Sequence, residues 1–202
     1  MPRFFAIIPA AGRSTRMGAP KLLLPVGNER LIERTLAAWK SGGVDWIVVV
    51  VRPDDAPLAT LCRSCGAEVV IPLIPPPEMK ASVQHGLQHI TTAFNPGEED
   101  AWLLAPADMP GLSPLIIQAL RSAHDPRNPA ILVPTIGGRR GHPVLFPWPL
   151  VHCVRSLGSD EGINALCQSQ SCREVPCDSC EPAGPAAFAD LDTPQDYDEF
   201  TK

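Results

Sequence analysis

Residues 4–21 read FFAIIPAAGRSTRMGAPK, a short apolar run that stops abruptly in small residues. The run Phe4–Ile8 predicts a buried β-strand. The segment after it holds two glycines and three cations: Gly12, Gly18, Arg13, Arg16 and Lys21. Glycine lets the backbone come close to a ligand, and the backbone N–H groups of such a loop form an anion-binding concavity that fixed cations deepen. The stretch therefore predicts a strand followed by a loop that binds a polyphosphate.

This loop differs from the two better-known phosphate loops. A P-loop has its lysine directly after the second glycine, whereas Lys21 follows Gly18 by three residues. The dinucleotide fingerprint has three glycines at the head of a helix, and only Gly12 and Gly18 are present here. Prolines within residues 10–25 indicate loop rather than helix. The alternative is an ordinary glycine-rich connection with solvated arginines.

The composition indicates one domain of ordinary size. The chain has 202 residues, enough for a three-layer core. A net charge of −5 leaves no basic field for nonspecific nucleic-acid binding. No apolar run approaches the ~20 residues of a membrane span, and the first residues do not resemble a signal peptide. We therefore expect a cytoplasmic protein that binds neither nucleic acid nor a membrane.

The seven cysteines do not indicate a disulfide framework, because their number is odd and no secretory signal precedes them. Cys62 and Cys65 form one Cys-x-x-Cys pair, and Cys177 and Cys180 form a second. This spacing is that of the two halves of a Cys₄ zinc site. Their settings favour buried or half-exposed free thiols, and a structural zinc is the alternative.

Strand-like and helix-like segments alternate through most of the chain. We expect strands at Phe4–Ile8, Trp46–Val51, Ala67–Ile71, Ala101–Ala105 and Ala130–Val133. We expect helices at Leu31–Lys40, Pro57–Ser64, Ser82–Ala93 and Pro114–Ala123. Continuous apolar strands indicate burial on both faces. The alternation predicts an α/β fold in three layers, with a mostly parallel central sheet and helices on both faces.

The pattern loosens after Pro134. There we expect strands at Gly141–Phe146, Arg173–Pro176 and Phe188–Asp192, and helices at Leu150–Leu157, Glu161–Gln168 and up to Phe200. Proline and glycine are frequent between these segments, which indicates loops rather than a linker between domains.

Carboxylates follow two of the expected strands. Asp108 lies just beyond the strand Ala101–Ala105, and ligands of parallel sheets bind at the carboxyl ends of the strands. A carboxylate facing a polyphosphate loop is well placed to hold Mg²⁺, which takes one or two protein carboxylates and completes its shell with phosphate and water. The alternative is an Asp that satisfies the backbone of its own turn. Asp190 and Asp192 share one face of their strand by alternation, and either is a candidate second ligand, with Asp192 favoured.

Two histidine signals are weaker. His85 and His89 have the i, i+4 spacing of metal ligands, but they flank the apolar stripe of an expected helix. A solvated helix face therefore explains them better than a metal site does. His142 precedes Pro143, and it is either structural or part of a binding site.

Four blocks together resemble the MobA/MocA-type nucleotidyltransferases, and among them especially the molybdenum cofactor cytidylyltransferases. The blocks are PAAGRSTRMGAPKLLLP (residues 9–25), PADMP (106–110), RGHPVLF (140–146) and DLDTPQDY (190–197). The resemblance runs in order over essentially the whole chain. It implies a Rossmann-like fold, here a single MobA-like domain over residues 1–202. Residues 1–134 would be the nucleotide-binding half, and residues 135–202 the acceptor-binding and closing elements.

The resemblance also implies roles for individual residues. The catalytic group is Arg16, Lys21 and Asp108. The residues that contact the nucleotide are Ala10, Ala11, Gly12, Arg13, Gly18 and Ser82. The acceptor pocket falls at Gly141, His142 and Pro143. The metal is Mg²⁺, held by Asp108 with Asp192 or Asp190.

The implied reaction is nucleotidyl transfer. An acceptor phosphate attacks the α-phosphorus of an NTP in line and pyrophosphate leaves, so no protein nucleophile is needed. The run Ala10-Ala11-Gly12 favours CTP over GTP, whereas Lys80 stands where the family usually has a small residue. The expected acceptor is molybdopterin, with a molybdoenzyme as a possible recipient, and we expect a monomer or weak dimer. The alternatives are a sugar 1-phosphate acceptor, or a non-catalytic NTP-binding accessory protein for a molybdoenzyme.

Overall fold

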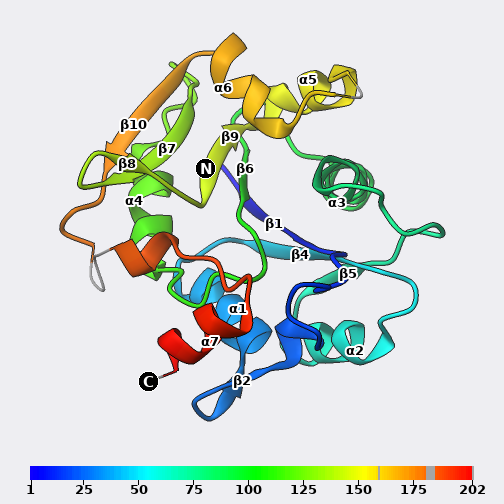
Figure 1. Ribbon diagram of the computed structural model, residues 1–202. Coiled ribbons are helices and arrows are strands. Elements are labelled where there is room, and N and C mark those ends of the chain that lie inside the picture. Colours follow the sequence, from blue (N-terminus) through cyan, green and yellow to red (C-terminus); the bar gives the residue numbers. More distant parts are fainter. Residues whose placement is uncertain (159, 181–184, 202) are drawn as a thin grey trace.

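The first strand of the chain lies in the middle of the sheet. The computed structural model describes residues 1–158, 160–180 and 185–201 (Figure 1). Strand β1 (Phe4–Ala10) is buried except at Pro9. It pairs in parallel with β4 (Trp46–Val51) on one side and with β6 (Ala101–Leu104) on the other. A strand with parallel neighbours on both sides and helices on both faces has no polar face, which explains its unbroken apolar sequence.

Eight strands form the main sheet, in the order β10-β7-β9-β6-β1-β4-β5, with β8 attached to β7. The remaining strands of this sheet are β5 (Glu68–Val70), β7 (Ile131–Ile136), β8 (Arg139–Arg140), β9 (Val144–Pro147) and β10 (Cys172–Pro176). Strand β9 runs antiparallel to both of its neighbours, β6 and β7, while β10 pairs with β7 in parallel. The predicted mostly parallel sheet is thus confirmed, with one reversed strand inserted.

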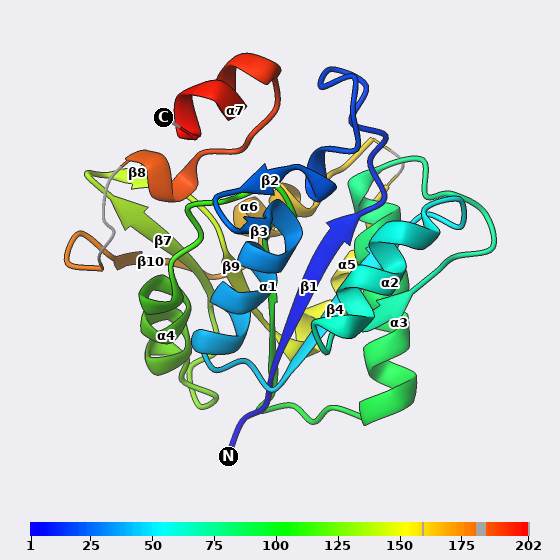
Figure 2. The same ribbon diagram turned by 90° about the horizontal axis from the view of Figure 1, so that it is seen from below.

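Helices cover both faces of this sheet, as predicted. On one face α1 (Leu31–Ser41), α2 (Ala56–Ser64) and α4 (Pro114–Ala123) pack on Phe4, Ala6, Ile8 and Ala10. On the other face α3 (Met79–Phe94), α5 (Val151–Ser156) and α6 (Leu166–Ser169) pack on Phe5 and Ile7. Figure 2 shows α1, α2 and α4 in front of the sheet and α5 and α6 behind it. Alternate residues of β1 therefore build two separate cores.

The helix starts follow local chemistry. Ser113 caps α4 by accepting a hydrogen bond from Leu115 N at 3.3 Å, with Pro114 in the first helical position. Thr193 caps helix α7 (Pro194–Phe200), because its hydroxyl accepts a hydrogen bond from Asp196 N. In return, the Asp196 carboxylate accepts a hydrogen bond from Thr193 N at 2.7 Å. This reciprocal capping box fixes the position of the segment just before it.

The predicted strand Phe188–Asp192 is wrong. Residues 185–188 form the 3₁₀ turn η4 (Pro185–Phe188), and the chain then continues without sheet pairing. One backbone bond, from Leu191 N to Asp108 O at 3.0 Å, holds the segment to the rest of the fold. Thus the alternation of apolar and acidic residues here serves to bury Leu191 against the protein rather than to build a strand.

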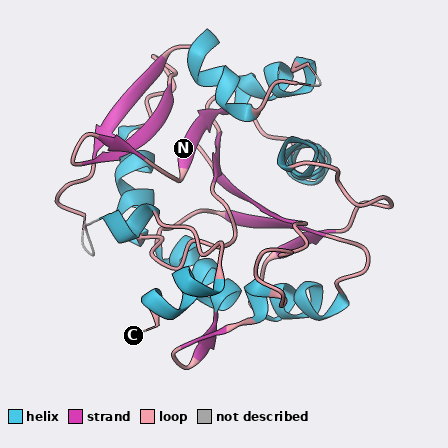
Figure 3. Cartoon of the chain, viewed as in Figure 1, coloured by secondary structure: helices cyan, strands magenta, loops and turns pink. Residues whose placement is uncertain are grey.

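Two other regions differ from the sequence prediction. The expected loop at residues 10–25 contains the 3₁₀ turn η1 (Lys21–Leu23) and the first strand of a small hairpin, β2 (Pro25–Val26) with β3 (Glu29–Arg30). The helix expected at Glu161–Gln168 is shorter. It consists of the 3₁₀ turn η3 (Ile163–Ala165) and α6, and a further 3₁₀ turn, η2 (Trp148–Leu150), precedes α5 (Figure 3).

The described helices are all too short or too polar to cross a membrane.

Candidate active site

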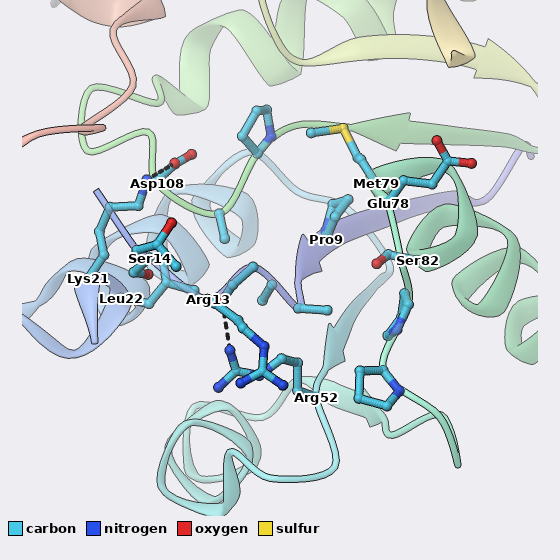
Figure 4. Close-up of a pocket in the computed structure, with 18 of the residues that line it drawn as sticks. Pro9, Arg13, Ser14, Lys21, Leu22, Arg52, Glu78, Met79, Ser82 and Asp108 are labelled. Atoms are coloured by element: carbon cyan, nitrogen blue, oxygen red, sulfur yellow. Dashed lines mark hydrogen bonds and ion pairs between the residues drawn. The ribbon is translucent and has the colours of Figure 1, made fainter. Parts of the chain in front are cut away.

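A pocket of about 730 Å³ opens beyond the carboxyl ends of β1, β4 and β6. Loops that follow neighbouring parallel strands meet at this edge of a sheet. Most of the wall comes from residues 9–16, 75–79 and 106–108, and the remaining lining residues are Lys21, Leu22, Arg52, Ser82, Asp190 and Asp192. Figure 4 shows Lys21 and Asp108 on one side of this pocket, with Glu78, Met79 and Ser82 on the other.

The loop after β1 brings several predicted nucleotide-binding residues to the pocket. Its lining residues include Ala10, Ala11, Gly12, Arg13 and Arg16. The loop closes with a turn in which Met17 N donates to Ser14 O at 3.0 Å, and Ser14 has a positive φ of 49°. Gly18, with φ 65°, does not line the pocket and serves this turn. A positive φ is costly for serine but not for glycine. Gly18 therefore suits its backbone conformation, whereas Ser14 is held in an unfavourable one.

Lys21 lies between two carboxylates from distant parts of the chain. Its Nζ contacts Asp108 Oδ2 at short range and Asp192 Oδ1 at 3.2 Å. Arg16 Nη1 reaches Asp192 Oδ2 at 3.0 Å. The side chains of Lys21 and Asp108 are only 11% and 17% exposed, whereas Arg16 is 70% exposed. The structure thus joins the predicted catalytic residues Arg16, Lys21 and Asp108 with Asp192 in one charged cluster.

Asp190 completes this acidic group. Asp190 and Asp192 both line the pocket, while Leu191 between them is buried at 2% exposure. The side chains at 190 and 192 therefore share one face, as predicted, although no strand imposes the alternation. The pKa of Asp190 is raised to about 6, first by desolvation within the pocket and then by the charges of Asp108 and Asp192, while Lys21 opposes the rise. Desolvation and two neighbouring carboxylates thus outweigh one ammonium group.

The acidic group is chemically suited to Mg²⁺, which prefers carboxylate oxygens. Asp108 Oδ1 is buried and has no hydrogen-bond partner among the described residues, and a buried carboxylate oxygen of this kind is costly until a cation or a donor reaches it. Within the described part of the chain, no group of three or more His, Cys, Asp or Glu side chains is arranged to hold a metal alone. A cation at this position would need ligands from the substrate and water, which is the usual arrangement for Mg²⁺.

The opposite wall is formed by the approach to α3 and its first turn. Pro75, Pro76 and Pro77 line the pocket, followed by Glu78 and Met79. Ser82, which was predicted from the resemblance, is on this wall and is 3% exposed. The three prolines remove backbone N–H donors and restrict φ, so this wall is stiff. Among its lining residues, Glu78 is the charged one.

Arg52 is a pocket residue that the sequence prediction missed. It directly follows β4, lines the pocket, and its Nη1 donates to Gly12 O at 3.4 Å. Its Nε donates to Asp54 Oδ1 at 2.9 Å, and Arg13 Nη1 lies 3.7 Å from Asp54 Oδ2. The rule that found Asp108, a polar residue directly after a buried strand, applies equally to Arg52.

The predicted acceptor residues lie outside the pocket lining. An added Cβ at Gly141 would stand 2.2 Å from a ring carbon of Phe188, so Gly141 packs beneath that ring. The bond between His142 and Pro143 is cis. Burial lowers the pKa of His142, and the nearby charge of Asp108 opposes that shift. His142 is therefore near the carboxylate group, but an acceptor role for these three residues stays a prediction.

The other metal signals are separated from this site. His85 and His89 lie on α3 beside a shallow apolar groove at residues 70–74. One Cys-x-x-Cys pair belongs to the end of α2, near β5, and the other follows β10, while β5 and β10 are opposite edges of the sheet. All seven cysteines are free thiols. The two pairs therefore do not come together around one zinc ion.

Known proteins share this fold and parts of this sequence. The 2-C-methyl-D-erythritol 4-phosphate cytidylyltransferase of Paraburkholderia phymatum is 32% identical over 124 residues, 60% of this chain and 52% of that protein. The chain thus spans about half the length of the curated relatives it matches.

Solved structures match over nearly the whole chain. Rv0371c of Mycobacterium tuberculosis H37Rv superposes with a TM-score of 0.80 at 24% identity over 98% of both chains, and it has also been solved in complex with manganese. Molybdopterin-guanine dinucleotide biosynthesis protein A of Archaeoglobus fulgidus gives a TM-score of 0.71 at 18% identity, over 98% of this chain and 96% of that one. At these identities the structural likeness establishes the fold.

A model of the MobA-like NTP transferase domain matches residues 6–175. The match includes the strand and loop from which the pocket begins, as well as Asp108 and the strand β9. It covers most of the chain, which therefore belongs to the family of MobA-like NTP transferase domains.

Proposed function

We propose that this protein is a Mg²⁺-dependent nucleotidyltransferase that moves an NMP group from an NTP to a phosphorylated small molecule. The observation that carries the proposal is the position of Lys21 between Asp108 and Asp192. A buried cation and several carboxylates at one end of a pocket suit the binding of a triphosphate together with a divalent cation. Membership of the MobA-like family supports this assignment.

Asp108 and either Asp190 or Asp192 would hold the Mg²⁺. The ion would neutralise part of the charge that develops on the triphosphate. The manganese complex of Rv0371c supports a divalent cation in this fold. Because Asp192 is already engaged by Lys21 and Arg16, Asp190 is the carboxylate with fewer contacts to give up.

The protein's own contribution is placement and charge. An oxygen of the acceptor phosphate forms a bond to the α-phosphorus, the bond from that phosphorus to the bridging oxygen breaks, and pyrophosphate leaves with the electron pair. A phosphate monoester is already largely ionised at neutral pH, so its attack needs no general base. Lys21 and Arg16 would bind the triphosphate and stabilise its developing charge.

CTP is the proposed donor. The loop Ala10-Ala11-Gly12 borders the pocket, and the curated relative at 32% identity is named as a cytidylyltransferase. Ser82 on the opposite wall is the proposed contact to the base.

The proposed acceptor is molybdopterin, with delivery of the product to a molybdoenzyme. The sequence blocks that resemble the molybdenum cofactor cytidylyltransferases support it, as does the likeness in fold to the Archaeoglobus protein. A second candidate is a phosphorylated polyol, since the curated relative acts by name on 2-C-methyl-D-erythritol 4-phosphate. Sugar 1-phosphates belong to the same chemical class.

A pyrophosphate-release screen tests the proposal. Each of the four NTPs is paired with molybdopterin, 2-C-methyl-D-erythritol 4-phosphate and common sugar 1-phosphates, with Mg²⁺ present and then chelated. We expect release with CTP and one acceptor, and none after chelation. Nucleotide binding without release in every pairing would contradict the proposal and favour a non-catalytic accessory protein.

A further inference from the structure

A buried lysine stands directly behind one wall of the pocket. Lys80 is the second residue of α3 and is 7% exposed. Its Nζ donates to Gly158 O at 2.6 Å and to Glu161 O at 2.9 Å, and it lies 3.3 Å from Glu78 Oε1. The lysine thus joins the loop that follows α5 to the residue that precedes α3.

This position is unfavourable for a cation unless its contacts compensate. The first turn of a helix has a positive electrostatic potential, which favours acidic rather than basic side chains. Burial adds the cost of removing the ammonium group from water. Replacing a whole buried ion pair with apolar side chains of similar size is often neutral for stability, or even stabilising. The stability of the fold alone is therefore a weak explanation for a lysine here.

The residues around Lys80 face the pocket. Glu78, Met79 and Ser82 line it, so they bracket the lysine within a single turn of the chain. On the other side, Gly158 and Glu161 are themselves joined, because Glu161 Oε2 accepts a hydrogen bond from Gly158 N at 2.8 Å. Through these oxygen contacts the ammonium group links Gly158 and Glu161 to the wall that faces the pocket.

We propose that Lys80 is a positioning residue that fixes this wall of the pocket through Glu78 and the carbonyls of Gly158 and Glu161. The inference rests on the proposed function, since it concerns how the same pocket holds its nucleotide. Lys80 does not border the charged cluster around Lys21, so its loss weakens nucleotide binding and leaves the chemical step nearly unchanged. In kinetic terms KM for the NTP rises while kcat is retained.

Gln84 offers a matched control. It lies one turn further along α3, and its Nε2 donates to Val154 O at 3.1 Å, so it joins the same helix to α5, just before the residues that Lys80 contacts. It does not line the pocket. Lys80→Met and Gln84→Leu each remove a donor from α3, but only the first acts on the wall that carries Glu78 and Ser82.

The experiment is calorimetric titration of each variant with CTP and Mg²⁺, without acceptor, together with melting temperatures and steady-state kinetics. We expect Lys80→Met to raise the Kd for CTP about tenfold, the effect of losing roughly one ordered contact. We expect kcat to stay within about threefold, and Gln84→Leu to leave the Kd unchanged.

A double-mutant cycle with Glu78→Gln tests the route of the effect. If Lys80 acts through Glu78, the Kd for CTP of the double variant Lys80→Met/Glu78→Gln is no higher than that of the single variant with the higher Kd. Effects on binding that simply add would overturn this route.

The outcomes separate the two proposals. If the unmodified protein binds no nucleotide, the proposed function fails. If it binds CTP and Lys80→Met binds equally well, only the role of Lys80 is refuted, even when the melting temperature falls. Should Lys80→Met not fold, Glu161→Ala loosens the same loop from its exposed side. We then expect a Kd about threefold higher, and an unchanged value refutes the inference.

Discussion

The two walls of the pocket differ in almost every physical respect. The wall around Lys21 is charged, and its carboxylates come from segments as far apart in the chain as residues 108 and 192. The lining residues of the other wall are three prolines, an exposed methionine, a buried serine and one half-exposed carboxylate, all from the single continuous segment 75–82. The comparison suggests a division of labour in which the charged wall controls turnover and the stiff wall controls which nucleotide binds.

Replacing Lys21 should have the largest effect. We expect Lys21→Met to lower kcat about 10²- to 10³-fold, the scale for removing one preorganised electrostatic contact, with a smaller change in KM. Steady-state pyrophosphate release measures both constants, and a melting curve checks that the variant folds. If KM alone changed, the charged wall would serve binding rather than turnover, and the proposed division between the two walls would be wrong.

Replacing Asp108 should have the next largest effect. Asp108→Asn removes one charge from the proposed metal site and should lower turnover about a hundredfold at a fixed Mg²⁺ concentration. Part of the loss should be recovered as Mg²⁺ is raised, because the variant binds the ion more weakly. A titration of rate against Mg²⁺ shows this. If the variant and the unmodified protein reached half-maximal rate at the same Mg²⁺ concentration, Asp108 would act only through its contact with Lys21.

Ser82→Ala tests the opposite wall and should have a moderate effect. We expect KM for CTP to rise about five- to tenfold, the equivalent of one neutral hydrogen bond, with kcat almost unchanged. Measuring KM for all four NTPs sharpens the test, because a contact to the base should affect one nucleotide more than the others. A fall in kcat without a change in KM would place Ser82 in the chemical step and blur the contrast between the walls.

Asp100, remote from both walls, should change neither kinetic constant. It is buried and accepts hydrogen bonds from Arg3 N at 2.7 Å, from the Arg3 guanidinium, and from Gly97 N at 2.8 Å. Burial alone would raise the pKa of Asp100, but these hydrogen bonds outweigh it and lower the pKa below its usual value. Because Arg3 is 35% exposed, solvent screening weakens the pair, and we expect Asp100→Asn to cost about 1–2 kcal/mol of unfolding free energy at neutral pH.

The pH dependence of this difference has a defined sign. The carboxylate of Asp100 has a lower pKa in the folded than in the unfolded protein, so its contribution is complete above the unfolded value of about 4 and is lost as pH falls through the folded value. Urea unfolding of both proteins between pH 3 and 7 should therefore show two curves that converge in acid. Curves that stay parallel would indicate that Asp100 contributes through packing rather than charge.

Sequence alone predicted the central part of the fold because its signals are local. Continuous apolar strands and capped helices predict the succession along the chain of β1, β4, β6 and the helices between them. The reversed direction of β9 was not predicted, since the sequence of a buried strand is the same whichever way it runs. The false strand at Phe188–Asp192 has the same origin, because alternation at a surface segment resembles a half-buried strand. The proposed division of the chain at residue 134 stays a prediction.

The candidate site was predictable where it depends on residues that end strands. Asp108 follows a buried strand and was predicted, and Arg52, which follows β4, carries the same local signal. The contact of Lys21 with Asp192, 171 residues further along, depends on tertiary structure and has no local signal. The same holds for Lys80, whose partners at 158 and 161 lie about eighty residues away.

The distance in sequence between Lys21 and Asp192 also has a consequence for synthesis of the chain. The central strands β1, β4 and β6 can pair on the ribosome once residue 104 has emerged, because all three belong to the first half of the chain. The charged cluster cannot, because one of its carboxylates is made 171 residues after the lysine that it contacts. Until residue 192 has left the exit tunnel, Lys21 and Asp108 form only part of the site. A nascent chain should therefore pair its central strands well before it acquires its complete cluster of charges.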